Sequence, residues 1–276
     1  MIRLALSSVF YLFLVFFAHK TLADEAFITA QNAQSLDIID LTSMTKRLSV
    51  PIAGKPAGVA LSKDGRRVFV TSPEGHFVTI VDRKAGRIEK QIPVKGGPLG
   101  IAVTRAGERL YVTDFYGDML VEIDLITQKQ RYLPIGAKPA GLALTLDEKT
   151  LLVAARDDNQ IIFVDLNEFS RLDQLAVGRH PYGVTIDADG RRAYVANVES
   201  DSVSVIDLAS RKAIAQLKVE SHPYGIALAS GRIFISNQHS ESLSVFDAKD
   251  LTHVATVAVG DYRSEEHTSE LQSLRH

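Results

Sequence analysis

Residues 180–207 read HPYGVTIDADGRRAYVANVESDSVSVID, and the phrases of this segment recur along most of the chain. Its Pro-x-Gly phrase returns with a spacing of 41 or 42 residues, and the aspartate that ends its last hydrophobic run returns with nearly the same period. The repeated glycines are Gly58, Gly100, Gly141, Gly183 and Gly225, and the repeated aspartates are Asp40, Asp82, Asp124, Asp165, Asp207 and Asp247. Independent landmarks that keep one period indicate a repeat architecture.

Each repeat contains four short hydrophobic runs that have the composition of β-strands. In the fifth repeat these runs are residues 182–186, 192–196, 202–207 and 214–219, rich in Val, Ile and Tyr and separated by turn residues such as Asp189-Gly190. No stretch of the repeats has a helical period. Four antiparallel strands in about 42 residues are typical of a β-propeller blade, so we predict an all-β propeller.

The phase of the repeat predicts how many blades the chain contains. Residues 26–30 match the second strand of a repeat, so the first blade is expected to have three strands, followed by five complete blades. We assign residues 24–262 to this propeller domain. Because a propeller ring closes by pairing strands from both chain ends, we expect a C-terminally incomplete chain. One further strand would give six blades, and one further repeat plus that strand would give seven, which is the number that we favour for the natural form.

The repeated phrases resemble those of a known family. Pro-x-Gly-hydrophobic-Ala, Asp-Gly-Arg-Arg-x-Tyr-Val-x-Asn and Ser-Val-Ile-Asp are similar to the repeats of YVTN-repeat, YncE-like propellers, over residues 26–262. The chain departs from this pattern at Asp147-Glu148 and at Ser230-Gly231, both within turns. The resemblance implies an exported seven-bladed propeller of the WD40/YVTN type, and it carries no catalytic motif that could be transferred to this chain.

The two ends of the chain differ from the repeats. Arg3 is followed by an uncharged apolar run over residues 4–18, too short to span a bilayer and of the right length for a secretory signal. We therefore interpret residues 1–23 as a cleaved signal peptide and expect a periplasmic protein with no membrane span after cleavage. Residues 263–273 read RSEEHTSELQS, which matches the in-frame translation of a common sequencing adapter, so residues 263–276 are interpreted as a non-native tail.

Composition excludes several classes of protein. The chain has 276 residues, 46% of them hydrophobic, a net charge of −2, no cysteine and no tryptophan. The absence of cysteine excludes disulfides, thiolate metal sites, cysteine nucleophiles and covalent c-type haem. The near balance of charge argues against binding to nucleic acid, and the absence of tryptophan argues against a quinoprotein dehydrogenase.

The repeated aspartates and glycines are interpreted as structural residues. Each aspartate precedes a turn in which its carboxylate can accept backbone N–H groups. Each glycine is expected to let the chain turn sharply into the inner strand of a blade.

The residue before each repeated proline is the strongest candidate for function. These residues are Lys55, Gly97, Lys138, His180 and His222, and His76 and His239 are expected in loops on the same face. Basic and titratable groups around a channel mouth can concentrate an anion. Two alternatives stay open, namely ordinary solvated turn residues and a zinc or copper site built from these histidines and nearby carboxylates. The carboxylates expected on this face are Glu74, Asp114, Asp118, Asp157, Asp158, Glu199, Asp201 and Glu241.

The turns of the opposite face are predicted to be basic. Their cations are Lys63, Arg66, Arg67, Arg83, Lys84, Arg87, Arg105, Arg109, Arg191, Arg192, Arg211 and Lys212. Such turns usually keep a β-rich surface soluble, and they could instead contact an acidic partner or nucleic acid, although no interleaved exposed aromatic residues for base stacking are evident.

These observations favour a monomeric, non-catalytic periplasmic scaffold that needs no cofactor and binds a small anionic ligand or a protein partner at the channel mouth. No nucleophile elbow or phosphate-binding glycine loop is present. Two alternatives remain, a lactonase-like hydrolase and an accessory protein of a periplasmic dehydrogenase or electron-transfer system.

Overall fold

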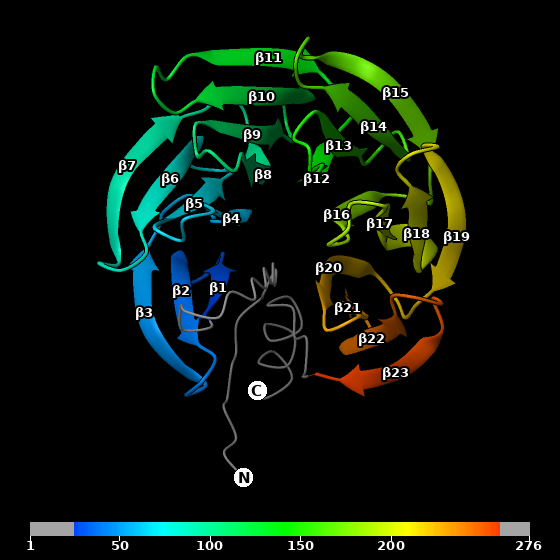
Figure 1. Cartoon of the computed structure of the whole chain (residues 1–276). Helices are drawn as coiled ribbons and strands as arrows, with labels where there is room; N and C mark the ends of the chain where they lie inside the picture. The colour runs from blue at the N-terminus through cyan, green and yellow to red at the C-terminus, as the bar shows by residue number, and fades with distance from the viewer. Residues whose placement is uncertain (1–24, 260–276) are drawn as a thin grey trace, which may run out of the picture.

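The computed structural model describes residues 25–259 and arranges them as six antiparallel sheets around a common centre (Figure 1). The predicted signal peptide and the predicted adapter-derived tail lie outside the described residues. The prediction of an all-β propeller with a three-stranded first blade and five four-stranded blades is confirmed.

The six sheets follow one another along the chain, and each is called a blade. Blade 1 comprises β1 (Glu25–Ala30), β2 (Ser35–Asp40) and β3 (Thr45–Pro51). Blade 2 comprises β4 (Val59–Leu61), β5 (Arg67–Ser72), β6 (Phe77–Asp82) and β7 (Arg87–Pro93). Blade 3 comprises β8 (Pro98–Val103), β9 (Arg109–Asp114), β10 (Met119–Asp124) and β11 (Gln130–Pro134). Blade 4 comprises β12 (Pro139–Leu144), β13 (Thr150–Ala155), β14 (Gln160–Asp165) and β15 (Ser170–Ala176).

Blades 5 and 6 complete the described chain. Blade 5 comprises β16 (Pro181–Ile186), β17 (Arg192–Asn197), β18 (Ser202–Asp207) and β19 (Lys212–Lys218). Blade 6 comprises β20 (Pro223–Ala229), β21 (Arg232–Asn237), β22 (Ser242–Asp247) and β23 (His253–Ala258). The 3-10 turn Val198–Ser200 is the one helical element among the described residues. Strand β19 begins two residues earlier than predicted, because a bulge between Val205 and Ile206 extends its pairing to Lys212.

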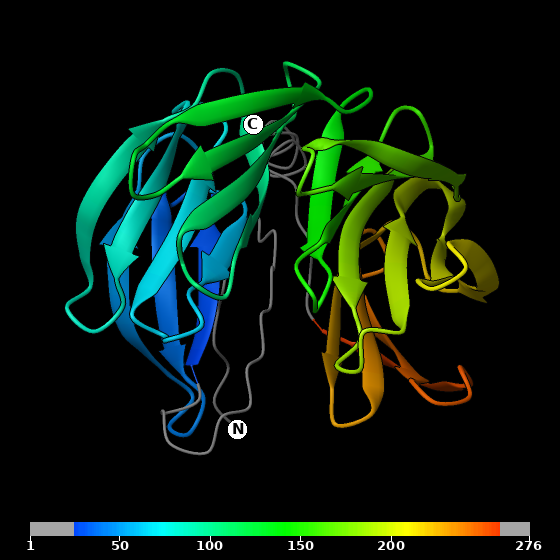
Figure 2. The same cartoon turned by 45° about the horizontal axis from the view of Figure 1, so that its top comes forward.

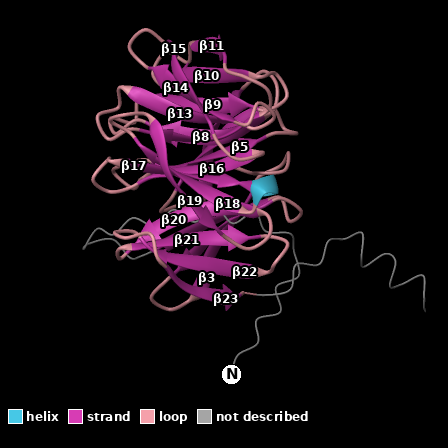
Figure 3. Cartoon of the chain, turned by 90° about the vertical axis from the view of Figure 1, so that its right-hand side faces the viewer, coloured by secondary structure: helices cyan, strands magenta, loops and turns pink. Residues whose placement is uncertain are grey.

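Strands β4, β8, β12, β16 and β20 line the centre of the ring, and the last strand of each blade lies at the periphery (Figure 1). The tilted view in Figure 2 shows the strands of each blade fanning out from the centre. Seen edge-on, the loops and turns project from two opposite faces of the molecule (Figure 3). Side chains that belong to different blades can therefore meet on either face.

The hydrophobic core lies between adjacent blades. Phe27, Leu36 and Ile38 of blade 1 pack against Val68 and Val70 of blade 2, and the boundaries between later blades repeat this arrangement. Blades 2 to 5 thus bury one face against the preceding blade and the other against the following one. At the outward face of blade 6, Val257 is 48% exposed, whereas the equivalent Leu217 of blade 5 is 6% exposed beneath blade 6.

A buried threonine joins neighbouring blades near the centre. The Gly100 N–H donates to Thr113 Oγ1 over 2.7 Å, and the Thr113 hydroxyl donates to the carbonyl oxygen of Ala140 in blade 4 over 2.6 Å. Thr71 makes the equivalent bonds to Gly58 and to Leu99 of blade 3. The second strand of one blade is therefore bonded directly to the inner strand of the next.

The repeated glycines are required by this contact, and the predicted reason for them was wrong. Gly58, Gly100, Gly141 and Gly183 do not have positive φ angles, so they do not form sharp turns. A Cβ atom on Gly100 would lie 2.3 Å from the Ala140 carbonyl oxygen, and the other three glycines face a carbonyl oxygen of the following blade at similar distances. Any side chain there would force two inner strands apart.

The repeated aspartates hold the turns between the third and fourth strands. In blade 3, Asp124 Oδ1 accepts the N–H groups of Ile126 over 2.9 Å and Thr127 over 2.7 Å. Asp40, Asp82, Asp165, Asp207 and Asp247 accept backbone N–H groups of their own turns in the same way. These bonds lower the pKa of Asp124 below its ordinary value, the bond from Thr127 being the largest cause.

Replacement of Gly100 by alanine tests the inter-blade contact. We expect Gly100→Ala to lower the free energy of unfolding in urea by about 3 kcal/mol, because the backbone of β12 must shift to admit the methyl group. Gly107→Ala is the matched control, since its Cβ would meet nothing within 4 Å although Gly107 has a φ of +68°. The control is expected to cost about 1 kcal/mol from backbone strain. Equal costs for the two variants would contradict the assigned role of Gly100.

Candidate functional site

Two sets of connections form the face that we call the channel-mouth face. They are the turns that lead from the last strand of one blade to the first strand of the next, and the loops between the second and third strands of each blade. Hydrogen bonds tie the two sets together: Asp118, Asn159 and Asp201 of the loops accept the N–H groups of Lys138, His180 and His222, each over 2.9 Å. The loop of each blade thus positions the turn that enters the next blade.

The residues before the repeated prolines have an unusual backbone conformation. Lys55, Lys138, His180 and His222 have φ angles of 59°, 51°, 51° and 57°, in the left-handed region that non-glycine residues rarely adopt. Because the backbone conformation is the same at each position, the four side chains leave the backbone at equivalent points of their turns. Other turn residues of the chain, such as Gln128 and Arg211, share this conformation, so it belongs to the turns of the fold.

His180 lies between two carboxylates. Its Nδ1 atom is 2.7 Å from Glu199 Oε1, and its Nε2 atom is 3.9 Å from Asp157 Oδ1. Asp157 also forms an ion pair with Arg156. This side of the channel mouth therefore places an imidazole beside two carboxylates, one of which also pairs with Arg156.

His222 and His239 come from different segments and stack against each other. Their ring centroids are 3.6 Å apart and their planes differ by 26°, while His222 Nδ1 lies 2.9 Å from the Ser221 hydroxyl. Partial burial lowers the pKa of His239, a positive charge on His222 lowers it further, and Asp201 raises it. The pair thus disfavours the state in which both rings are protonated.

The remaining predicted residues lie on the same face without joining these histidines. Lys138 Nζ lies 5.3 Å from the ring centroid of Phe115 and 5.6 Å from that of Tyr116, a cation–π arrangement. His76 Nδ1 lies 2.5 Å from the carbonyl oxygen of Gly96. The Lys55 side chain forms no ion pair with the described residues. The predicted set is therefore divided. Its members on blades 2 and 4 are Lys55, His76 and Lys138, and those on blades 5 and 6 are His180, His222 and His239.

Two tyrosines of this region were missed as candidates by the sequence analysis. The residue between the repeated proline and glycine is Ala57, Leu99, Ala140, Tyr182 or Tyr224 in successive blades. The first three form a cluster against which Tyr182 packs, and Tyr182 meets Tyr224 edge to face with ring centroids 4.9 Å apart. The alignment of the Pro-x-Gly phrases contained this signal, because only blades 5 and 6 carry a large polar aromatic residue there.

Half of the eight carboxylates of the metal hypothesis accept backbone N–H groups. Asp114 Oδ1 accepts three N–H groups, and Asp158 accepts the N–H of Ala137, in addition to Asp118 and Asp201 described above. In residues 25–259 no group of three or more His, Asp or Glu side chains is placed to hold a metal ion. Glu199 and Asp157 are the acids that contact His180, and they flank its two ring nitrogens separately.

Comparison with known proteins supports the fold and no closer relation. No protein-family model matches the chain, and no curated protein sequence matches it. Hydrazine synthase of Kuenenia stuttgartiensis is similar in structure, with a TM-score of 0.72, 18% identity, and coverage of 86% of this chain and 84% of that one. Virginiamycin B lyase of Staphylococcus aureus is similar with a TM-score of 0.72 and 17% identity, and the match covers 87% of this chain and 82% of that one. A streptogramin B lyase is similar with a TM-score of 0.75 and 16% identity, and the match covers 86% of this chain and 80% of that one. These likenesses define the chain as a β-propeller.

Helices that could cross a membrane were also sought. Within the described residues, none is long and apolar enough to span a bilayer.

The pKa of His239 predicts a pH dependence of stability. Unfolding restores its ordinary value of 6.5, so the unfolded chain binds a proton more readily than the folded one between the lowered pKa and 6.5. Stability is therefore lost as the pH falls through this window. We expect the melting temperature of wild type to fall more between pH 8 and pH 5 than that of His239→Gln, by about one or two degrees after allowance for solvent screening. His253→Gln, at an exposed outer-strand histidine, is the control. The same attenuation in the control, or none in His239→Gln, would contradict the assignment.

Proposed function

We propose that the chain is an exported, non-catalytic binding propeller whose channel-mouth face takes a small organic anion with an aromatic or apolar body. The observation that carries the proposal is the asymmetry of this face. The close contacts between inner strands recur from blade to blade, whereas the side chains before and after each proline differ. A specific binding site requires side chains that differ between blades, whereas the propeller fold forms without such differences.

Aromatic side chains supply the proposed contact surface for the body of the ligand. Tyr182 and Tyr224 are both partly exposed, and the stacked pair of His222 and His239 follows on blade 6. Aromatic residues combine a large contact area with a polar end and favour offset or edge-to-face partners. An aromatic ring from a ligand or from a partner loop could therefore pack against these tyrosine and histidine rings on blades 5 and 6.

The lysines supply the proposed contact for the anionic group. Lys138 has aromatic neighbours and no carboxylate partner, and Lys55 forms no ion pair in the described part of the chain. Two carboxylates contact the His180 side chain, whereas Asp118 and Asp158 are bonded to the backbone N–H groups of Lys138 and Ala137 and form no ion pair with the Lys138 side chain among the described residues. The charges therefore favour one orientation, with the anionic end of the ligand toward blades 2 to 4.

Export to the periplasm and membership of the YVTN-repeat, YncE-like family belong to the same proposal. They rest on the apolar segment at residues 4–18 and on the repeated phrases of residues 26–262. The similar solved structures are too distant in sequence to bring their activities to this chain.

A catalytic role is the second candidate, favoured by one contact. Glu199 lies 2.7 Å from His180 Nδ1, and a carboxylate in that place can orient an imidazole as a general base. Hydrolysis of a panel of sugar lactones, abolished in His180→Ala, would support this lactonase-like alternative over binding alone.

Binding of aromatic carboxylates tests the leading proposal. We expect benzoate and 4-hydroxybenzoate to bind saturably in saturation-transfer NMR, and benzylamine not to bind. Tyr182→Ala/Tyr224→Ala is expected to weaken binding about tenfold through lost aromatic contacts. Lys138→Ala and His180→Ala/His222→Ala should weaken it as well.

An exposed tyrosine elsewhere on the chain provides the control. Tyr132 lies on the outer strand β11 and is 44% exposed, so Tyr132→Ala should leave the affinity unchanged. Preference for the amine, or equal losses in the control and the double tyrosine variant, would refute the proposed site.

A further inference from the structure

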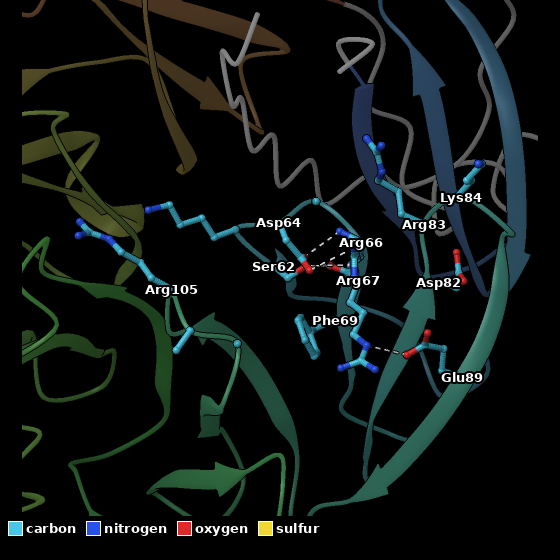
Figure 4. Close-up of a pocket in the computed structure, with 14 residues that line it drawn as sticks. Ser62, Asp64, Arg66, Arg67, Phe69, Asp82, Arg83, Lys84, Glu89 and Arg105 are labelled. Atoms are coloured by element: carbon cyan, nitrogen blue, oxygen red, sulfur yellow. Dashed lines mark hydrogen bonds and ion pairs between the residues drawn. The ribbon is translucent and has the colours of Figure 1, made fainter. Parts of the chain in front are cut away.

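A cavity lies on the face opposite the channel mouth, at the boundary of blades 2 and 3. Its volume is about 690 Å³, within the range typical of small-molecule sites. It is formed by the turn between β4 and β5, the turn between β6 and β7, and the turn between β8 and β9. Figure 4 shows Arg66 and Arg67 in the middle of this cavity, with Arg105 on one side and Arg83 and Lys84 on the other.

The lining carries a surplus of positive charge. Its six cations are Lys63, Arg66, Arg67, Arg83, Lys84 and Arg105, against three acids, Asp64, Asp82 and Glu89. The whole chain, in contrast, has a net charge of −2. The lining is therefore more positive than the chain as a whole.

The three acids of the lining are already occupied. Asp64 Oδ1 accepts the Ser62 hydroxyl and the Arg66 N–H over 2.6 and 3.0 Å, and Asp82 Oδ1 accepts the Ala85 N–H over 2.8 Å. Glu89 accepts Arg67 Nε over 2.7 Å (Figure 4). The acids thus hold turns and one arginine in place.

Three of the six cations of the lining form no ion pair with the described residues. Arg83 is paired with Glu25 over 3.2 Å, outside the cavity lining. Lys63, Lys84 and Arg105 form no ion pair within the described residues, and all three side chains are exposed. Their charges remain available to a ligand.

The fold does not require these three charges. Blade 5 builds the equivalent turn from residues 187–192, in which Asp187 accepts the N–H groups of Arg191 and Arg192 over 2.8 and 3.0 Å. At the positions of Lys63 and Lys84, blade 5 has Ala188 and Ala209. The same turns therefore form without the cations.

We propose that this cavity binds a small polyanion whose oxyanion groups are clustered, such as an organic phosphate or a polycarboxylate. Lysine and arginine N–H groups form charge-assisted bonds to such groups, and arginine can do so through two parallel bonds. A nucleic-acid strand fits less well, because Phe69, the aromatic residue of the lining, is 1% exposed and cannot stack on a base. The site is on a different face from the channel mouth and does not depend on the function proposed there.

Calorimetric titration of the full chain with inorganic pyrophosphate and with citrate at 50 mM NaCl tests the proposal. We expect saturable binding of at least one of them that weakens as salt is added, because the cations are exposed. Lys63→Ala/Lys84→Ala/Arg105→Ala should weaken that binding at least about tenfold. Preference for pyrophosphate would identify the phosphate class, and preference for citrate the polycarboxylate class.

A variant with the same loss of charge elsewhere on this face is the control. Arg191→Ala/Lys212→Ala/Lys249→Ala removes three exposed cations of blades 5 and 6 and should change the affinity less than twofold. In wild type, the backbone amide NMR signals of Gly65 and Gly107 should move on titration and that of Gly190 should not. This second readout applies even if a triple variant fails to fold.

Three results would overturn the proposal. They are the absence of saturable binding of both anions, equal weakening in the two triple variants, and competition by an oligothymidylate whose affinity grows with its length. The last result would assign the face to nucleic acid.

Discussion

The structure depends on a close contact between the inner strands of neighbouring blades. At Gly100 the backbone approaches the Ala140 carbonyl so closely that no side chain fits, and the Thr113 hydroxyl bonds to both strands. Each hydrogen bond contributes only about 1 kcal/mol, so most of the stability comes from the apolar side chains buried between blades. The glycines allow the inner strands to approach to the distance at which those side chains meet. Because this distance is the same at successive boundaries, near-identical sheets form a regular ring.

A repeated scaffold leaves specificity to the positions that do not repeat. The channel-mouth face departs from the repeat at the residues around each proline, where blades 5 and 6 carry tyrosines and histidines and blades 2 and 4 carry lysines. The opposite face departs from it at the turns of blades 2 and 3, where cations surround a cavity. These two departures differ in chemistry, since one offers aromatic surface and the other unpaired positive charge. The two proposed sites lie on opposite faces, so a ligand at one is not expected to block the other.

Much of the fold could be predicted from the sequence, because a period of about 42 residues with four hydrophobic runs admits few architectures. The turn aspartates were also predictable, since their hydrogen bonds are local in sequence. The role of the repeated glycines could not be predicted, because the carbonyl oxygen that excludes a side chain at Gly58 or Gly183 belongs to the next blade. For the same reason, sequence analysis grouped His180 with Lys55 and Lys138 as a basic ring, whereas Glu199 and Asp157 lie beside His180. Contacts between blades join residues that are far apart along the chain, and spacing alone does not show which side chains meet.

Native-state hydrogen exchange of the Gly58 and Gly100 amides tests the central claim most directly. Both amides donate to a buried threonine that is bonded to the next blade. They are therefore expected to exchange only when the whole domain unfolds, with the same free energy as the central strands β5 and β9. Exchange of these two amides at rates near those of an unfolded chain, while β5 and β9 stay protected, would show that the blades are not joined in this way.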